Sequence, residues 1–131
     1  MKLLLDTCTF LWFAQLPEKL PPKVASALTD PDNKLFLSAV SLWEILISHM
    51  RGKVLPLRVP DTPARYFVEL RKRLEIESLP VYEAAAAQLT KLPDIHRDPF
   101  DRLLICQSIE HGLTLTTPDA HISRYPIRTL W

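Results

Sequence analysis

Glycine is scarce in this sequence, with two glycines among 131 residues. Loops that wrap phosphate groups need several closely spaced glycines, so dinucleotide-binding and Walker-type loops are both excluded. Cysteine is equally scarce: Cys8 and Cys106 stand far apart, no CxxC pair exists, and no Cys/His cluster has zinc-site spacing. We interpret both cysteines as reduced core residues of a cytoplasmic protein.

The chain also lacks a strong net charge and a long apolar run. Lys and Arg number 16 and Asp and Glu 15, so the whole chain has no electrostatic signature for nucleic acid, and charge matters only locally. No run approaches the roughly 18 apolar residues of a membrane span. Met1 to Leu16 superficially resembles a signal peptide, but Asp6 interrupts its apolar core and no cleavage site follows. We expect a cytoplasmic protein that does not bind membranes.

A chain of this length suits one domain, which we place at residues 1–131. Short apolar runs predict strands at 2–5, 35–37, 76–79, 113–116 and 127–131. Helical spacing predicts helices at 7–14, 23–28, 39–50, 61–74, 82–89 and 99–111. This alternation predicts an α/β fold, with a parallel or mixed sheet between layers of helices.

Two further expectations concern the middle of the chain. Helix 39–50 carries an apolar stripe of Val40, Trp43, Ile47 and Met50. After it, residues 51–57 are expected to form a loop with basic residues at its edge.

The most informative stretch begins at Asp98. Asp98 is a good helix N-cap, Pro99 is favoured at the first helical position, and Gly112 can end the helix. Asp101 then lies in the first turn, where the helix dipole favours its ionised form. Asp119 stands just past the end of strand 113–116.

Two other carboxylates join this pattern. Asp6 follows the first strand, and Glu44 lies beside the apolar stripe of helix 39–50. Parallel strands end, and their following helices begin, at one edge of the sheet, so Asp6, Asp98, Asp101 and Asp119 can converge there. Glu44 must reach in sideways. Two unit charges about 4 Å apart repel by roughly 4 kcal/mol at an effective dielectric near 20, which a divalent cation would offset.

All-oxygen ligation suits Mg²⁺ or Mn²⁺, and no histidine or cysteine belongs to this acidic set. The reaction that such a site favours is metal-assisted hydrolysis of a phosphodiester. Each residue also has an explanation that needs no metal. Asp6 can simply end a strand, Glu44 can pair with a buried arginine, and Asp98 can be a plain cap. Asp101 can serve the helix dipole and Asp119 a turn.

Four segments together resemble a known family. They are residues 3–7 (LLLDT), 37–45 (LSAVSLWEI), 96–105 (HRDPFDRLLI) and 113–119 (LTLTTPD). The sequence is similar to PIN-domain ribonucleases, specifically VapC-like toxins of type II toxin–antitoxin pairs. The resemblance implies a PIN-like three-layer α/β/α fold with a mainly parallel central sheet.

The same resemblance implies a function. It implies a Mg²⁺- or Mn²⁺-dependent endoribonuclease that cleaves RNA, is inhibited by a cognate VapB-like antitoxin, and forms a homodimer. It assigns catalytic roles to Asp6, Glu44, Asp101 and Asp119, and metal binding to these four together with Asp98.

Two alternatives remain for comparison. A haloacid-dehalogenase-like phosphatase also begins with a strand that ends in Asp, but it needs a second Asp where Cys8 stands. A catalytically inactive PIN-like scaffold would bind RNA or protein without cleaving it. Basic residues that can contact RNA phosphates are Arg51, Lys53, Arg65, Arg71, Lys72, Arg73 and Arg97.

Overall fold

The computed structural model describes residues 1–53 and 59–131, and its centre is a five-stranded sheet. The strands are β1 (Lys2–Leu5), β2 (Lys34–Ser38), β3 (Glu77–Leu79), β4 (Thr114–Thr116) and β5 (Thr129–Leu130). Their order across the sheet is β3-β2-β1-β4-β5, and every pairing between them is parallel. The predicted parallel α/β architecture is therefore confirmed.

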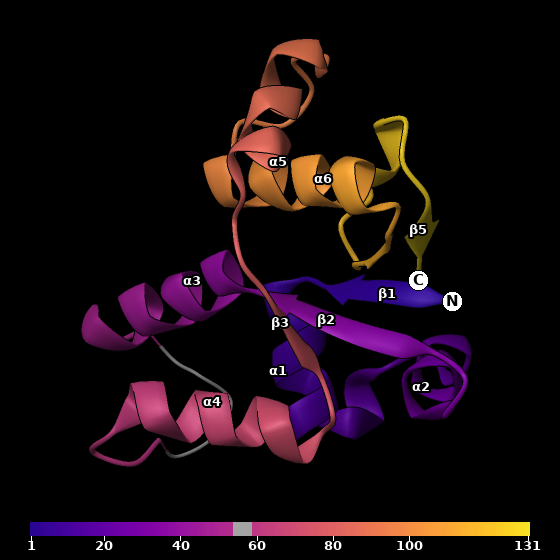
Figure 1. The fold of residues 1–131 in the computed structure, drawn as a ribbon. Helices are drawn as coiled ribbons and strands as arrows, with labels where there is room; N and C mark the ends of the chain where they lie inside the picture. The colour runs from indigo at the N-terminus through magenta and orange to yellow at the C-terminus, as the bar shows by residue number, and fades with distance from the viewer. Residues whose placement is uncertain (54–58) are drawn as a thin grey trace.

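Helices cover both faces of the sheet (Figure 1). They are α1 (Thr7–Gln15), α2 (Pro22–Thr29), α3 (Ala39–Met50), α4 (Pro63–Arg73), α5 (Glu83–Ala87) and α6 (Pro99–His111). Helices α1, α2 and α4 lie on one side, and α5 and α6 on the other (Figure 1). Short 3-10 turns span Pro17–Lys19, Gln88–Lys91 and Ile122–Arg124. In the described part of the chain, no helix is long and apolar enough to cross a membrane.

The central strand explains why two helical layers form. Leu3, Leu4 and Leu5 are all fully buried, because successive side chains of a strand point to opposite faces of the sheet. Leu3 and Leu5 pack with Phe10 on the α1 side, whereas Leu4 packs with Leu104 on the α6 side. A strand that is apolar on both faces needs cover on both, which is the reason for three layers.

The strand order also fixes where a site can form. From β1 the chain moves outward in one direction through β2 and β3, and in the other direction through β4 and β5. The switch point therefore lies between β1 and β4, which pair directly. In open α/β sheets, ligands bind outside the carboxyl ends of the strands at such a point.

Most element boundaries agree with the sequence prediction to within two residues, and helix 39–50 agrees at both ends. Two predictions are wrong in extent. The last strand is only Thr129–Leu130, and helix 82–89 is a five-residue α5 that continues as a 3-10 turn. The predicted loop at 51–57 falls mainly on positions 54–58, which lie outside the described residues.

The predicted apolar stripe of α3 is only partly covered. Val40 packs against the core, but Trp43 is 62% exposed and Met50 84% exposed, and the buried positions of α3 are Ser41 and Ile45. Met50 is the last residue of α3, whose far end projects beyond the sheet (Figure 1).

Candidate active site

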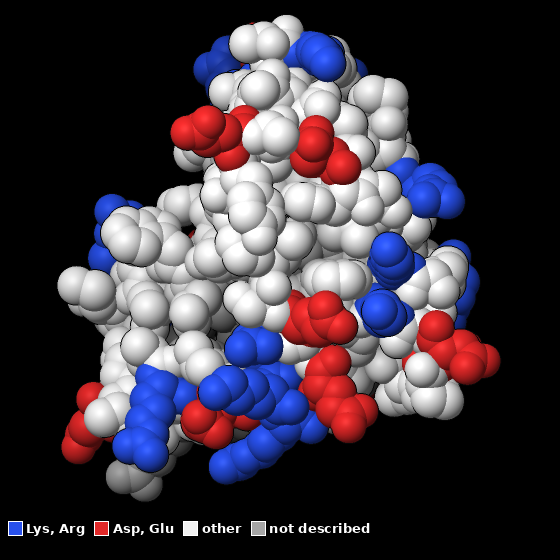
Figure 2. All heavy atoms as spheres, in the orientation of Figure 1, with Lys and Arg blue, Asp and Glu red and all other residues white. Residues whose placement is uncertain are grey.

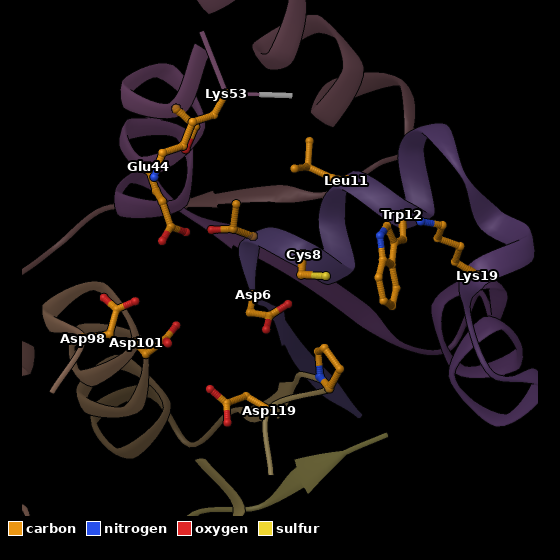
Figure 3. Close-up of a pocket in the computed structure, with 13 residues that line it drawn as sticks. Asp6, Cys8, Leu11, Trp12, Lys19, Glu44, Lys53, Asp98, Asp101 and Asp119 are labelled. Atoms are coloured by element: carbon orange, nitrogen blue, oxygen red, sulfur yellow. The ribbon is translucent and has the colours of Figure 1, made fainter. Parts of the chain in front are cut away.

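A cavity of about 730 Å³ opens at the carboxyl edge of the sheet, beside the switch point. All five carboxylates singled out in the sequence line it: Asp6, Glu44, Asp98, Asp101 and Asp119. Their side chains come from different segments of the chain and face a common space (Figure 3). The predicted convergence of these residues is thus what the structure shows.

Asp6 ties this cavity to the core of the fold. It follows β1 directly and is the N-cap of α1, where one carboxylate oxygen accepts the Thr9 N–H at 2.8 Å. Its own backbone N–H donates to the Thr116 carbonyl at the end of β4. Asp6 is only 7% exposed. Burial raises its pKa, and hydrogen bonds from Thr117 and Thr9 oppose that shift without cancelling it.

Asp119 lies across the switch point, three residues after β4. Its backbone N–H donates to the Thr117 hydroxyl at 3.1 Å, and its Oδ1 accepts the His121 N–H at 2.8 Å. Partial burial favours the protonated acid, but this bond from His121 and a bond to His96 outweigh it, so the pKa of Asp119 is lowered. The contacts of Asp119 therefore favour its ionised form.

The start of α6 supplies two carboxylates with different duties. Asp98 is the N-cap, as predicted: its side chain accepts the Phe100 N–H at 2.9 Å, and Pro99 occupies the first helical position. Asp101 lies in the first turn and faces the cavity (Figure 3).

The ionisation of Asp101 differs from the prediction. Burial, and next the charge of Asp98, raise the pKa of Asp101 to about 7, while His96 opposes this shift. The helix N-terminus does not outweigh desolvation and repulsion here, because its effect is typically no more than about 1 kcal/mol.

Glu44 enters the cavity from the side of α3, more than a turn from the start of that helix. Burial raises its pKa, and the charges of Asp98 and Asp6 raise it further. The alternative explanation, a buried arginine partner, finds no support: within the described residues Glu44 forms no ion pair.

His96 is the residue that the sequence analysis missed. Its Nε2 lies 3.0 Å from Asp101 Oδ2 and 2.9 Å from Asp119 Oδ2. One ligand atom from each of these three residues falls within 4.8 Å of the other two. The expectation of an acidic set without histidine is therefore wrong. The available signal was its position two residues before Asp98 in the most specific motif.

The rest of the cavity wall is mixed in character. Trp12 and Lys19 lie at the end away from Asp98 (Figure 3), and the Lys19 ammonium stands 5.5 Å from the centre of the Trp12 ring. Cys8 also lines the cavity and is half-buried, so its prediction as a core residue is wrong, whereas Cys106 is buried as expected.

The predicted phosphate contacts are only partly placed at this cavity. Lys53 lines it, but Arg71 donates to the Ile76 carbonyl and Lys72 lies 3.9 Å from Glu69. Lysine and arginine side chains gather instead over α4, interleaved with acidic ones (Figure 2).

The donor set fits a hard divalent cation. Five carboxylates line the cavity, and burial is the first cause of the raised pKa values of Asp6, Glu44 and Asp101. Oxygen ligands of this kind suit Mg²⁺ or Mn²⁺.

The sheet is all-parallel and acidic residues gather at its switch point. This arrangement is typical of α/β proteins whose ligands bind at the carboxyl ends of the strands. The sequence matches the PIN domain family over residues 3–127, and the chain belongs to that family. A search of curated proteins finds no match.

Solved structures share the fold. A chain of the VapBC2 complex from Rickettsia felis, crystallised with a DNA fragment from their promoter, has a TM-score of 0.74 and 14% identity, covering 100% of this chain and 99% of that one. A chain of VapBC-1 from nontypeable Haemophilus influenzae has a TM-score of 0.66 and 18% sequence identity, and the match covers 99% of this chain and 97% of that one. A chain of FitAcB from Neisseria gonorrhoeae has a TM-score of 0.65 and 17% sequence identity, and the match covers 98% of this chain and 96% of that one. The chain thus has the PIN fold found in these complexes.

Removing one charge from this site should stabilise the metal-free protein. The folded pKa of Asp101 is about 7 against an ordinary 3.8, so its protonation stabilises the fold at low pH. That stabilisation is lost as pH rises through about 7. With chelator present, Asp101→Asn should therefore exceed the wild type in melting temperature above pH 7. The gain should shrink toward pH 4.

We expect a gain of about 1–2 kcal/mol, or a few degrees, because the Asp101 side chain is still 20% exposed and water screens part of the repulsion. Thermal denaturation across this pH range measures it. Asp94→Asn, at an exposed position of the preceding loop, is the matched control. An equal gain at every pH would contradict the assignment to Asp101.

Proposed function

We propose that this chain is a metal-dependent endoribonuclease that acts as the toxin of a type II toxin–antitoxin pair in the cytoplasm. One observation carries the proposal: five carboxylates line a single cavity at the switch point of a PIN-family sheet. Helix capping accounts for Asp6 and Asp98, but gathering all five in one cavity costs stability, because the carboxylates repel one another and are partly desolvated.

In this proposal Asp6, Glu44 and Asp101 hold Mg²⁺ or Mn²⁺, with Asp119 beside them. Asp98 caps α6 with one oxygen, as Asp6 caps α1, so only its second oxygen is open to the cation. We place Asp98 at the margin of the set, with Asp101, which has no capping bond, as the ligand from α6. When bound, such a cation polarises a phosphodiester and activates water for hydrolysis. Because carboxylates repel an anionic phosphate, their role here would be to hold the cation. Asp119, whose pKa is lowered, stays ionised at neutral pH.

The cavity also has features that suit a nucleic-acid chain. Lys19 and Lys53 both line it and can contact phosphates on either side of the acidic centre. Trp12 offers an aromatic surface of the kind on which single-stranded bases stack. RNA is the substrate that the resemblance to VapC-like toxins implies.

Partners belong to the same proposal. The similar solved structures are complexes named VapBC and FitAcB. We infer that this chain likewise binds a small VapB-like antitoxin and forms a homodimer. Light scattering at micromolar concentration measures the oligomeric state, and a monomer would contradict the homodimer.

The alternative, an inactive PIN-like scaffold, explains the cavity less well. A protein that only binds RNA gains from basic residues, and it has no use for Asp6, Glu44 and Asp101 in one desolvated cavity. Binding of RNA without cleavage under every metal condition would favour the scaffold.

RNA cleavage should depend on a divalent cation. Purified protein should cleave a mixed RNA substrate with Mg²⁺ or Mn²⁺, lose this activity in EDTA, and regain it when excess cation is added. Gel analysis of labelled RNA measures this. Full activity in the chelator would exclude the metal mechanism.

The two aspartates at the start of α6 should differ. Asp101→Asn should abolish cleavage while the protein stays folded, because Asn cannot replace an anionic ligand. Asp98→Asn should be mild, since Asn caps a helix nearly as well as Asp, and Asp98→Ala should cost about 1 kcal/mol of stability. Cleavage rates and melting temperatures are the readouts, with Asp94→Asn as control. An active Asp101→Asn together with an inactive Asp98→Asn would reverse the assignment.

Toxicity should follow the same site. Expressed alone in a bacterial host, the wild type should arrest growth, and Asp6→Asn should not. Asn keeps the side-chain oxygen that accepts the Thr9 N–H, so α1 stays capped while the charge is lost. Growth curves at matched expression levels measure the effect. If Asp6→Asn arrests growth like the wild type, the toxic activity does not use this site.

A further inference from the structure

We propose that His96 positions Asp101 and Asp119 for cation binding, and that it does so as a hydrogen-bond donor rather than as a metal ligand. This inference rests on the proposed metal site and adds a residue outside its carboxylate set. It starts from how each aspartate of the cavity is held.

Three of the aspartates are anchored by the backbone close to them in sequence. One oxygen of Asp6 accepts the Thr9 N–H, one of Asp98 accepts the Phe100 N–H, and one of Asp119 accepts the His121 N–H. In each case the second oxygen can face a cation. The protein thereby fixes these side chains before any ligand arrives.

Asp101 is held differently. It lies inside the first turn of α6, and among the described residues its partner is a side chain, the His96 imidazole at 3.0 Å. The same Nε2 lies 2.9 Å from Asp119 Oδ2. The His96 ring therefore lies against both carboxylates, hydrogen-bonded to Asp119 and in contact with Asp101, and it links the start of α6 to the end of β4.

His96 is itself fixed from two sides. Its backbone N–H donates to the hydroxyl of the buried Tyr125 at 2.7 Å. Its ring Nδ1 lies 3.2 Å from the Asp98 N–H, which can only donate. Nδ1 must therefore accept, and in the neutral ring the proton then sits on Nε2. Asp119 Oδ2 accepts this proton at 2.9 Å, and Asp101 Oδ2 lies 3.0 Å from the same nitrogen.

The position of this proton determines whether His96 can bind a cation through Nε2 or can only donate a hydrogen bond from it. A protonated Nε2 has no lone pair for a cation, and ligation through it would require the proton to move to Nδ1 and break the bond from Asp98. As a donor, His96 keeps both Oδ2 atoms in place and leaves their remaining lone pairs to the cation. Outer partners of this kind typically change metal affinity by about 10–100-fold when they are removed.

The test compares Mn²⁺ affinity by titration calorimetry in the wild type and three variants. His96→Ala should weaken Mn²⁺ binding about 10–100-fold. His96→Gln should restore much of it, because its amide N–H reaches nearly as far as Nε2. His111→Ala removes another half-buried histidine at the opposite end of α6 and should bind Mn²⁺ like the wild type. Circular dichroism in chelator checks that each variant is folded.

A spectroscopic readout on the unmodified protein separates the two roles of His96. Pulsed electron paramagnetic resonance of bound Mn²⁺ should show no directly coordinated nitrogen. A strong nitrogen coupling would make His96 a ligand and overturn the inference, as would unchanged Mn²⁺ affinity in His96→Ala. A wild type that binds no Mn²⁺ would instead overturn the proposed metal site, and this inference with it.

Discussion

The constraint on which this site depends is the burial of mutually repelling carboxylates at one edge of a parallel sheet. Asp6, Glu44 and Asp101 all have raised pKa values, and burial is the first cause in each. Such a set persists only because the rest of the fold holds it. The apolar residues of β1, buried on both faces, provide that rigid base. The site therefore stores unfavourable electrostatic energy that the core of the protein offsets.

The side chains that generate this repulsion are also structural elements. Asp6 caps α1 and Asp98 caps α6, so two of the acidic residues stabilise the helices that bring the others together. The Thr9 hydroxyl donates to the Thr116 carbonyl and adds a second link between the start of α1 and the end of β4. The same side chains thus serve the acidic site and cap helices. Replacing Asp6 or Asp98 by Asn removes the charge and keeps the capping oxygen, whereas Ala removes both.

Sequence reasoning succeeded where local rules decide. The cap at Asp98, the proline after it and the left-handed Gly112 at the end of α6 depend on neighbours within a turn, and all three were predictable. The convergence of Asp6 and Asp119 followed from the geometry of parallel strands alone. His96 was missed because its contact with Asp119 spans 23 residues and depends on how the loop before α6 turns. The exposure of Trp43 was missed because periodicity identifies an apolar face and not whether anything covers it.

The strand order has a consequence for the protein as it is made. Strand β1 pairs with β4, so Asp6 meets Asp119 only after nearly the whole described chain has left the ribosome. Until then β1 lacks a neighbour on one side, and the cavity has no far wall. No N-terminal fragment that ends before β4 contains the complete acidic set. During synthesis the acidic set therefore stays incomplete until β4 and Asp119 have emerged, and its assembly coincides with the addition of β4 to the sheet.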